Sequence, residues 1–238
     1  MSRSCVVFLP GLLCDRAVWE AQIATLSHRY DCIVTDYGVA DSLSAMARST
    51  LESAPSRFAL IGHSMGGRVA LEMMREAPQR ITALALLDTG YQPRPEGEPG
   101  EAEARKRYRL LDIASSRGMR VMGREWVQGM IHPGRSHEAA LIESILAMIE
   151  RKTPAIFAAQ IRALLNRPPA EDVLRAIRCP TVVLCGRQDG WSPLSRHEQM
   201  ASMIAGATLA VIEDSGHMVT LERPETVSAQ LEGWLAQS

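Results

Sequence analysis

The 238-residue chain lacks the features that mark several classes of protein. Its five cysteines form neither a CxxC pair nor a Cys/His spacing typical of a metal site, so neither a disulfide scaffold nor a zinc module is indicated. Its charge is nearly balanced, at 26 Lys plus Arg against 27 Asp plus Glu, so no overall field favours nucleic acid or an anionic membrane as a partner. No internal repeat or low-complexity tract is present.

Long apolar runs are also missing. None approaches the roughly 18 residues of a membrane helix, and the run at residues 5–9 is too short for a signal peptide and has no cleavage site behind it. We therefore expect a cytoplasmic protein with reduced thiols. With 46% hydrophobic residues, the chain is long enough to bury the core of one domain.

Six short apolar runs alternate with stretches of helical period, which is the pattern of parallel strands joined by crossover helices. The sequence thus predicts an α/β fold with a six-stranded, mainly parallel sheet flanked by helices. Pro193 and Pro224 stand where prolines open helices. The predicted strands are residues 5–9, 31–36, 58–62, 82–88, 181–185 and 208–212, and the helices between the early strands are 17–26, 42–52 and 66–77.

Residues 90–166 break this rhythm, because they contain about four helical patterns and no strand-like run. Residues 92–99, rich in Pro, Glu and Gly, are expected to form an exposed linker into this segment. Residues 91–168 hold 13 basic and 9 acidic residues, a net charge of +4, which leaves 13 against 18, or −5, for the rest. We predict a core formed by residues 1–89 and 167–238, with residues 90–166 as an inserted helical unit.

The strongest local pattern is G-x-S-x-G at Gly62 to Gly66, between a predicted strand and a predicted helix. A serine on so tight a turn sits in strained backbone, where neighbouring Cβ atoms would collide with adjacent chain. The turn presents Ser64 at the carboxyl edge of the sheet and at a helix N-terminus, where N–H groups stabilise negative charge. Because Gly62, Gly66 and Gly67 do not form G-x-G-x-x-G, a dinucleotide loop is disfavoured. Ser64 is the predicted nucleophile.

A serine becomes a nucleophile only when a base takes its proton. His217 follows the last predicted strand directly, so it should reach the same sheet edge as Ser64, although a surface-loop histidine is the alternative. His63, beside the serine, is expected to point away. The other histidines lie at a helix end, in the inserted segment or in a helix: His28, His132, His137 and His197.

A carboxylate should orient the imidazole and stabilise its charged form. Asp189 follows the fifth predicted strand and gives the chain order Ser, Asp, His, with Asp88 as the runner-up. Two backbone N–H groups should stabilise the oxyanion. We predict that Met65 supplies one and that Leu12, after Pro10-Gly11, supplies the other, although Pro10-Gly11 also fits a simple turn.

On these residues the chain resembles the α/β-hydrolase superfamily, specifically single-domain serine esterases and lactonases with a helical cap. The resemblance extends from Leu9 to Leu235, and residues 222–225 are similar to the start of the family's final helix. It implies that residues 90–166 form the cap. This chain departs from the family in having Pro10-Gly11 where His-Gly is common. With only four residues before Cys5, the family's N-terminal antiparallel hairpin is expected to be absent.

The implied activity is hydrolysis of a carboxylic ester of a small molecule through an acyl-enzyme, with no metal and no cofactor. Alternatives that the sequence leaves open are C–C bond hydrolysis or a lyase reaction by the same residues, and a non-catalytic ligand-binding protein. The expected oligomeric state is a monomer or a homodimer. Leu12, Trp126, Trp191 and Met218 are candidate substrate-binding residues, and Met119, Met122, Met130 and Ile131 are apolar candidates that fit core packing as well.

The inserted segment is rich in arginine, and this suggests an anionic substrate. The resemblance to carrier-protein methyl ester esterases points the same way, towards a carrier-linked ester. Arginine exceeds lysine throughout the chain, however, so genome composition and ordinary helix surfaces are the alternative explanation. The basic residues in question are Arg105, Lys106, Arg107, Arg109, Arg151, Lys152 and Arg162.

Overall fold

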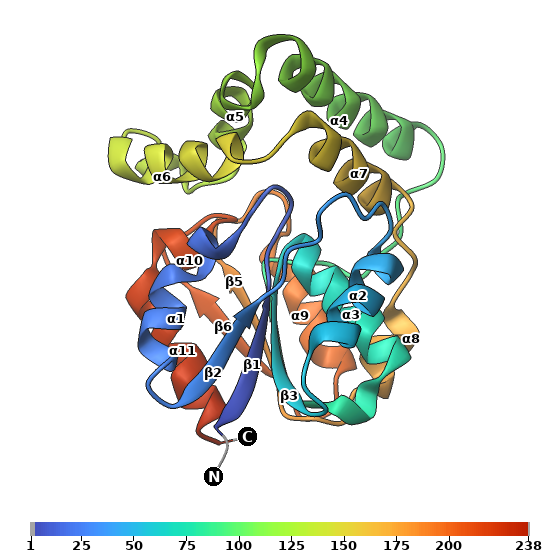
Figure 1. Ribbon diagram of the computed structural model, residues 1–238, viewed down its shortest axis with the longest axis vertical. Coiled ribbons are helices and arrows are strands. Elements are labelled where there is room, and N and C mark those ends of the chain that lie inside the picture. Colours follow the sequence, from blue (N-terminus) through green and yellow to red (C-terminus); the bar gives the residue numbers. More distant parts are fainter. Residues whose placement is uncertain (1–2, 238) are drawn as a thin grey trace.

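The computed structural model describes residues 3–237 and contains a six-stranded sheet between two layers of helices (Figure 1). All five pairs of neighbouring strands are parallel, in the order β2-β1-β3-β4-β5-β6, which confirms the predicted fold class. The observed strands begin and end within two residues of the predicted ones. They are β1 (Ser4–Leu9), β2 (Tyr30–Val34), β3 (Phe58–His63), β4 (Ile81–Leu87), β5 (Thr181–Gly186) and β6 (Thr208–Ile212).

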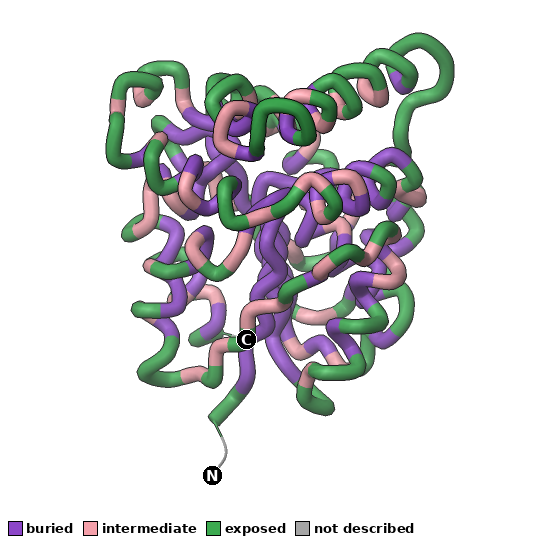
Figure 2. Tube along the Cα trace, turned by 45° about the horizontal axis from the view of Figure 1, so that its top comes forward, coloured by how far each residue is buried: buried purple, intermediate pink, exposed green. Residues whose placement is uncertain are grey.

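The central strands form the core of the molecule. Every residue of β3 and β5 is buried, and β1 is buried after Ser4, because helices cover both faces of the sheet. The edge strands β2 and β6 are only partly buried. Figure 2 shows this arrangement, with the buried chain in the middle and exposed chain around it. The unbroken apolar runs that predict strands are therefore those that lie inside the sheet.

Helices on the two faces explain the longer amphipathic stretches. Ser42 caps α2 by accepting a hydrogen bond from the N–H of Ala45. Pro224 opens α11 as predicted, whereas Pro193 precedes the first residue of α9. One face carries α1 (Glu20–Leu26), α10 (Val219–Glu222) and α11 (Pro224–Leu235), and the other carries α2 (Leu43–Ser53), α3 (Met65–Glu76), α8 (Glu171–Ala176) and α9 (Leu194–Met203); the short η1 (Arg16–Trp19) and η2 (Pro78–Arg80) precede α1 and β4.

Residues 90–166 are helical and lie across one end of the sheet (Figure 1). They form α4 (Glu98–Arg117), α5 (Met119–Trp126), η3 (Val127–Gly129), η4 (Pro133–Arg135), α6 (Ala139–Glu150) and α7 (Pro154–Leu165). The expected linker is shorter than predicted, because α4 begins at Glu98, with Pro99 in its first turn. Residues 1, 2 and 238, assigned to the core from the sequence, lie outside the described residues. Within residues 3–237, no helix has the length and apolarity needed to cross a membrane.

Candidate active site

Ser64 lies on the sharp turn between β3 and α3. Its backbone has φ 54° and ψ −117°, in the left-handed half of conformational space that costs a non-glycine residue energy. A Cβ on Gly62 would lie 2.6 Å from the carbonyl oxygen of Gly66, and one on Gly66 would lie 2.0 Å from the carbonyl oxygen of Leu9. Both positions therefore require glycine. The hydroxyl of Thr89 donates a 2.6 Å hydrogen bond to the Ser64 carbonyl and holds the turn.

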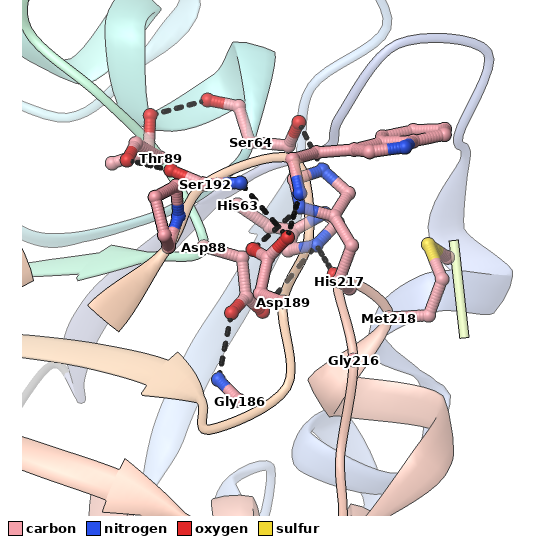
Figure 3. Close-up of polar contacts among 12 residues, drawn as sticks. His63, Ser64, Asp88, Thr89, Gly186, Asp189, Ser192, Gly216, His217 and Met218 are labelled. Carbon is pink, nitrogen blue, oxygen red and sulfur yellow. Dashed lines mark hydrogen bonds and ion pairs between the residues drawn. The ribbon is translucent and has the colours of Figure 1, made fainter. Parts of the chain in front are cut away.

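The three side chains predicted to act together form one hydrogen-bonded chain (Figure 3). The Ser64 hydroxyl lies 2.8 Å from Nε2 of His217, and Nδ1 of His217 lies 2.7 Å from Oδ2 of Asp189. A carboxylate only accepts, so the Nδ1–H of His217 donates to Asp189 and Nε2 is free to accept the serine proton. His217 and Asp189 are 5% and 3% exposed, which shields both contacts from water.

The environment keeps Asp189 ionised. Burial alone would raise its pKa, but the His217 ring and the N–H groups of Trp191 and Ser192 outweigh burial and lower the pKa below its usual value. Those two N–H groups bond to Oδ1 at 2.8 and 2.9 Å, which leaves Oδ2 for the histidine. The carboxylate is thus fixed in position and in charge.

Asp88, the alternative carboxylate, has a different environment. It is fully buried, and its Oδ1 accepts a 2.9 Å hydrogen bond from the Gly186 N–H rather than one from His217. Burial, with repulsion from Asp189, raises the pKa of Asp88 well above the usual range. The hydrogen bonds therefore join His217 to Asp189 and leave Asp88 as a support for the strand end of β5.

His63 was expected to point away from the site, and this expectation is wrong. Its buried ring lies 5.3 Å from that of His217, and its Nε2–H donates a 2.8 Å hydrogen bond to the His217 carbonyl. Burial, helped by the neighbouring His217, lowers the pKa of His63 to about 3, so it is neutral at ordinary pH. His63 supports the backbone of the residue that faces Ser64.

The loop after β1 lies directly against the turn that carries Ser64. A Cβ on Gly11 would approach Cβ of Ser64 to 3.2 Å, so glycine allows this loop to pass close to the serine. Leu12 and Met65, the predicted N–H donors, both line the cavity next to Ser64. Leu13 has φ 59°, and its N–H donates a 2.8 Å hydrogen bond to Oε1 of buried Gln160 in α7. A side chain from the helical segment therefore holds this loop in its strained shape.

A cavity of about 860 Å³ opens above Ser64. The indole rings of Trp126 and Trp191 stack at 5.4 Å, and Trp191 also lies 5.0 Å from the His217 ring. Met130 lines the cavity, whereas Met119, Met122 and Ile131 are buried in the core. All four candidate substrate-binding residues lie on the cavity wall: Leu12, Trp126, Trp191 and Met218.

Glu222 is a buried carboxylate whose contacts no sequence pattern indicates. Its Oε1 accepts from the N–H groups of Gly216 and Met218, at 2.9 and 3.2 Å, and its Oε2 accepts from His132 N–H at 2.7 Å. Burial raises the pKa of Glu222, although these donors oppose the shift. The N–H of His217 itself bonds to the Met130 carbonyl at 2.7 Å. Hydrogen bonds therefore hold the backbone on both sides of His217 to Glu222, and hold His217 itself to the helical segment.

Most of the basic residues noted in the helical segment are paired on its surface. Arg105 bonds to Glu98, Arg151 to Asp15, and Arg162 to Asp41, all in exposed positions. Arg109 likewise pairs with Glu125. Surface pairs of this kind contribute little to stability, but they offset the charge of these four arginines. Lys106 and Arg107 are the two that reach the cavity wall.

The cysteines and His197 lie outside the hydrogen-bonded chain of Ser64, His217 and Asp189. All five cysteines are free thiols, and Cys5, Cys14 and Cys185 are buried. His197, in α9, is fully buried, accepts a hydrogen bond from the Thr89 N–H, and has its pKa lowered by burial to about 4. In the described part of the chain, no group of three or more His, Cys, Asp or Glu side chains could hold a metal ion.

Residues 6–230 match the family described as "Alpha/beta hydrolase family", and the chain belongs to that family. It is accordingly an enzyme of the hydrolase class. It is 26% identical over 201 residues to the pimeloyl-[acyl-carrier protein] methyl ester esterase of Aromatoleum aromaticum, covering 80% of this chain and 79% of that protein. It is 21% identical over 253 aligned positions to a protein of Escherichia coli O127:H6 that carries the name carbamate hydrolase RutD, covering 97% and 91%.

A solved structure extends the similarity to the whole fold. The esterase from Thermogutta terrifontis, determined with malate bound, superposes with a TM-score of 0.88 at 28% identity, covering 99% of this chain and 90% of that one. The proteins similar to this chain therefore include esterases, which agrees with the resemblance drawn from the sequence.

Proposed function

We propose that this hydrolase cleaves a carboxylic ester of a small molecule through an acyl-enzyme formed on Ser64. The observation that carries the proposal is the continuous hydrogen-bonded chain from the Ser64 hydroxyl through His217 to Asp189. It lies at the base of a cavity large enough for a small organic substrate. A nucleophile, a base within reach and a group that orients the base are what covalent acyl transfer requires.

In the first half of the reaction, Ser64 Oγ attacks the ester carbonyl while its proton passes to Nε2 of His217. The imidazolium formed is stabilised by Asp189, whose lowered pKa keeps it charged. When the tetrahedral intermediate collapses, the bond from the carbonyl carbon to the alkoxy oxygen breaks, and His217 returns the proton to the departing alcohol. Water then gives a proton to the same nitrogen and attacks the acyl carbon; the bond from that carbon to Ser64 Oγ breaks, His217 returns the proton to Ser64, and the acid is released.

The negative charge on the carbonyl oxygen would be met by the N–H groups of Met65 and Leu12. Met65 opens α3, so its N–H is one of those that an α-helix leaves without an internal partner. The loop of Leu12 lies against the nucleophile turn and is held in place by Gln160. Donors fixed before the reaction stabilise the transition state without reorganisation.

The division of the chain is part of the same proposal. Residues 1–89 and 167–238 would form the core that carries Ser64, Asp189 and His217, and residues 90–166 the cap that closes the cavity. The positions of Trp126 and Met130 on the cavity wall support a role of this segment in substrate binding. The names of the relatives favour an ester substrate, including one linked to a carrier protein.

A fluorophosphonate probe tests the proposal. We expect it to label the wild type on Ser64, and we expect Ser64→Ala to lose both labelling and ester hydrolysis. Ser202→Ala, on the exposed surface of α9, is the matched control and should behave as the wild type. A panel of esters with graded acyl length would then define the acyl group.

A wild type that is neither labelled nor active on any ester, yet binds small ligands, would refute the proposal. That result would favour the non-catalytic alternative. Labelling without ester turnover would instead favour C–C bond hydrolysis or a lyase reaction by the same residues.

A further inference from the structure

Four arginines from separate parts of the chain line the cavity above Ser64: Arg68 of α3, Arg107 of α4, Arg167 in the loop after α7, and Arg196 of α9. A carbonyl and a carboxylate link three of them. The Gln92 carbonyl accepts hydrogen bonds from Arg68 at 2.9 Å and from Arg167 at 3.4 Å. Glu103 then accepts from Arg167 through both of its oxygens, at 2.8 Å each, and from Arg107 at 2.9 Å.

Arg196 completes the group on the other side of Arg68. A Cβ added to Gly90 would lie 2.9 Å from Nη2 of Arg68 and 2.9 Å from Cδ of Arg196, so both side chains pack over this glycine. Glu103 is thus the carboxylate that pairs with two of the four guanidinium groups. Among residues 3–237, neither Arg68 nor Arg196 has an ion-pair partner, and their hydrogen bonds go to neutral oxygens of Gln92, Trp191 and Ser192.

This arrangement is electrostatically incomplete. Burial, with repulsion from Arg167 and Arg196, lowers the pKa of Arg68 to about 9. Burial also lowers the pKa of Arg196. Both side chains are only partly buried, but an unpaired charge still loses part of its hydration without compensation. An anion between Arg68 and Arg196 would supply the missing partner.

The cluster is close to the reacting serine. Arg68 follows Ser64 by one helical turn, and its N–H lies 3.4 Å from the Ser64 carbonyl. Gly90, under Arg68 and Arg196, is the neighbour of Thr89, whose hydroxyl bonds to that same carbonyl. Ser64, Arg68 and Arg196 line the same cavity. One small molecule can therefore reach all three.

We propose that Arg68 and Arg196 bind a carboxylate carried by the ester substrate, so that the preferred substrate class is the half ester of a short dicarboxylic acid. This inference rests on the proposed esterase function. Guanidinium groups are planar forks that bind carboxylates through paired hydrogen bonds, and Arg167 already binds Glu103 in that way. The bound carboxylate positions the ester carbonyl over Ser64.

Matched anionic and neutral esters test this assignment. Monomethyl and dimethyl succinate, glutarate and adipate differ in charge at equal length. The measured quantity is the ratio of kcat/KM for the monomethyl ester to that for the dimethyl ester. We expect a ratio of about 10 or more in the wild type for the best chain length. Arg68→Met should lower it by about 10- to 100-fold, as expected for one charge-assisted hydrogen bond.

Arg196→Met is a second variant that tests the same site should Arg68→Met fail to fold, and it should lower the ratio in the same direction. Arg105→Met is the matched control, because Arg105 is exposed and paired with Glu98 on the outer surface of α4. Its ratio should equal that of the wild type. Thermal melts of each variant establish that the fold is retained.

A binding experiment separates this inference from the proposed function. Calorimetry on Ser64→Ala should detect glutarate but not glutaramide, and the double variant Ser64→Ala/Arg68→Met should lose glutarate binding. A wild type that is labelled at Ser64 and hydrolyses both esters at equal kcat/KM would overturn the carboxylate site and leave the esterase intact. Glutarate binding without ester hydrolysis would support the site and refute the esterase.

Discussion

Glu222→Gln tests whether a residue that never meets substrate sets the position of His217. The substitution keeps the size of the side chain and one oxygen, but it replaces the other oxygen with an NH₂ group. If the remaining oxygen still receives the N–H groups of Gly216 and Met218, the NH₂ group faces the N–H of His132. If the amide turns over, it faces the other two. Either way, at least one buried donor loses its acceptor.

The size of the effect follows from these contacts. One buried N–H left unsatisfied costs about 1–3 kcal/mol. For a chain of this length, 1 kcal/mol corresponds to roughly 2–4 °C in Tm, so we expect Tm to fall by about 2–12 °C. The loop on both sides of His217 also loosens, and a misplacement of about 1 Å at a reacting group can cost about 100-fold in rate. We therefore expect kcat to fall by about 10- to 100-fold, with KM nearly unchanged.

The assay is steady-state hydrolysis of a reactive ester, together with a thermal melt of each variant. Glu213→Gln is the matched control, because Glu213 belongs to the same loop but is 60% exposed and paired with Arg187. That change should alter stability by less than about 0.5 kcal/mol and leave kcat unaffected. A Glu222→Gln variant that melts at a lower temperature but keeps the wild-type kcat would refute the positioning role and leave a purely structural one.

Two further predictions concern other buried groups. Gln160→Leu removes the acceptor for the Leu13 N–H and should lower kcat by about tenfold, less than the loss of a whole oxyanion donor; unchanged esterase kinetics would contradict this support role. Asp88→Asn keeps an acceptor for Gly186 N–H and removes a carboxyl whose pKa is raised by burial. The folded state holds the proton of such a group more tightly than the unfolded state. The free energy of unfolding therefore falls as pH rises from the unfolded pKa of 3.8 towards the folded pKa, by at most about 1.4 kcal/mol per pH unit. Urea unfolding at pH 5, 7 and 9 should therefore show that the free energy of unfolding of Asp88→Asn rises relative to that of the wild type as pH increases. A difference between the two proteins that is the same at every pH would contradict this prediction.

The sequence pattern predicted features that depend on local chain geometry. The strands are visible because the inner strands of a parallel sheet need unbroken apolar runs. The turn at Ser64 can be predicted because it requires glycine at positions 62 and 66, where a Cβ would collide with neighbouring backbone. The placement of Asp189 and His217 followed from topology, since the carboxyl ends of parallel strands share one edge.

Local reasoning failed where a contact depends on how distant segments pack. The prediction for His63 treated it as a neighbour of Ser64 in sequence, but its ring is directed by the backbone of His217, 154 residues away. The arginine-rich helical segment suggested an anionic substrate, but Arg105 and Arg109 are paired with carboxylates on its surface. Arg68 lies in the predicted helix 66–77, where its local pattern does not distinguish it from a solvent-exposed arginine.

The sequence by itself determined the sheet, the turn at Ser64 and the loops from which the other two members of the hydrogen-bonded chain come. Each of these depends on short-range sterics or on the burial of apolar runs, which leave a pattern in consecutive residues. Only the tertiary structure decided which polar side chains become buried partners, among them Glu222 and Gln160, and which reach the cavity wall, as Arg68 does. A glutamate or an arginine looks the same in sequence whether water or a protein donor satisfies it, because its energy is set by the groups that folding brings around it.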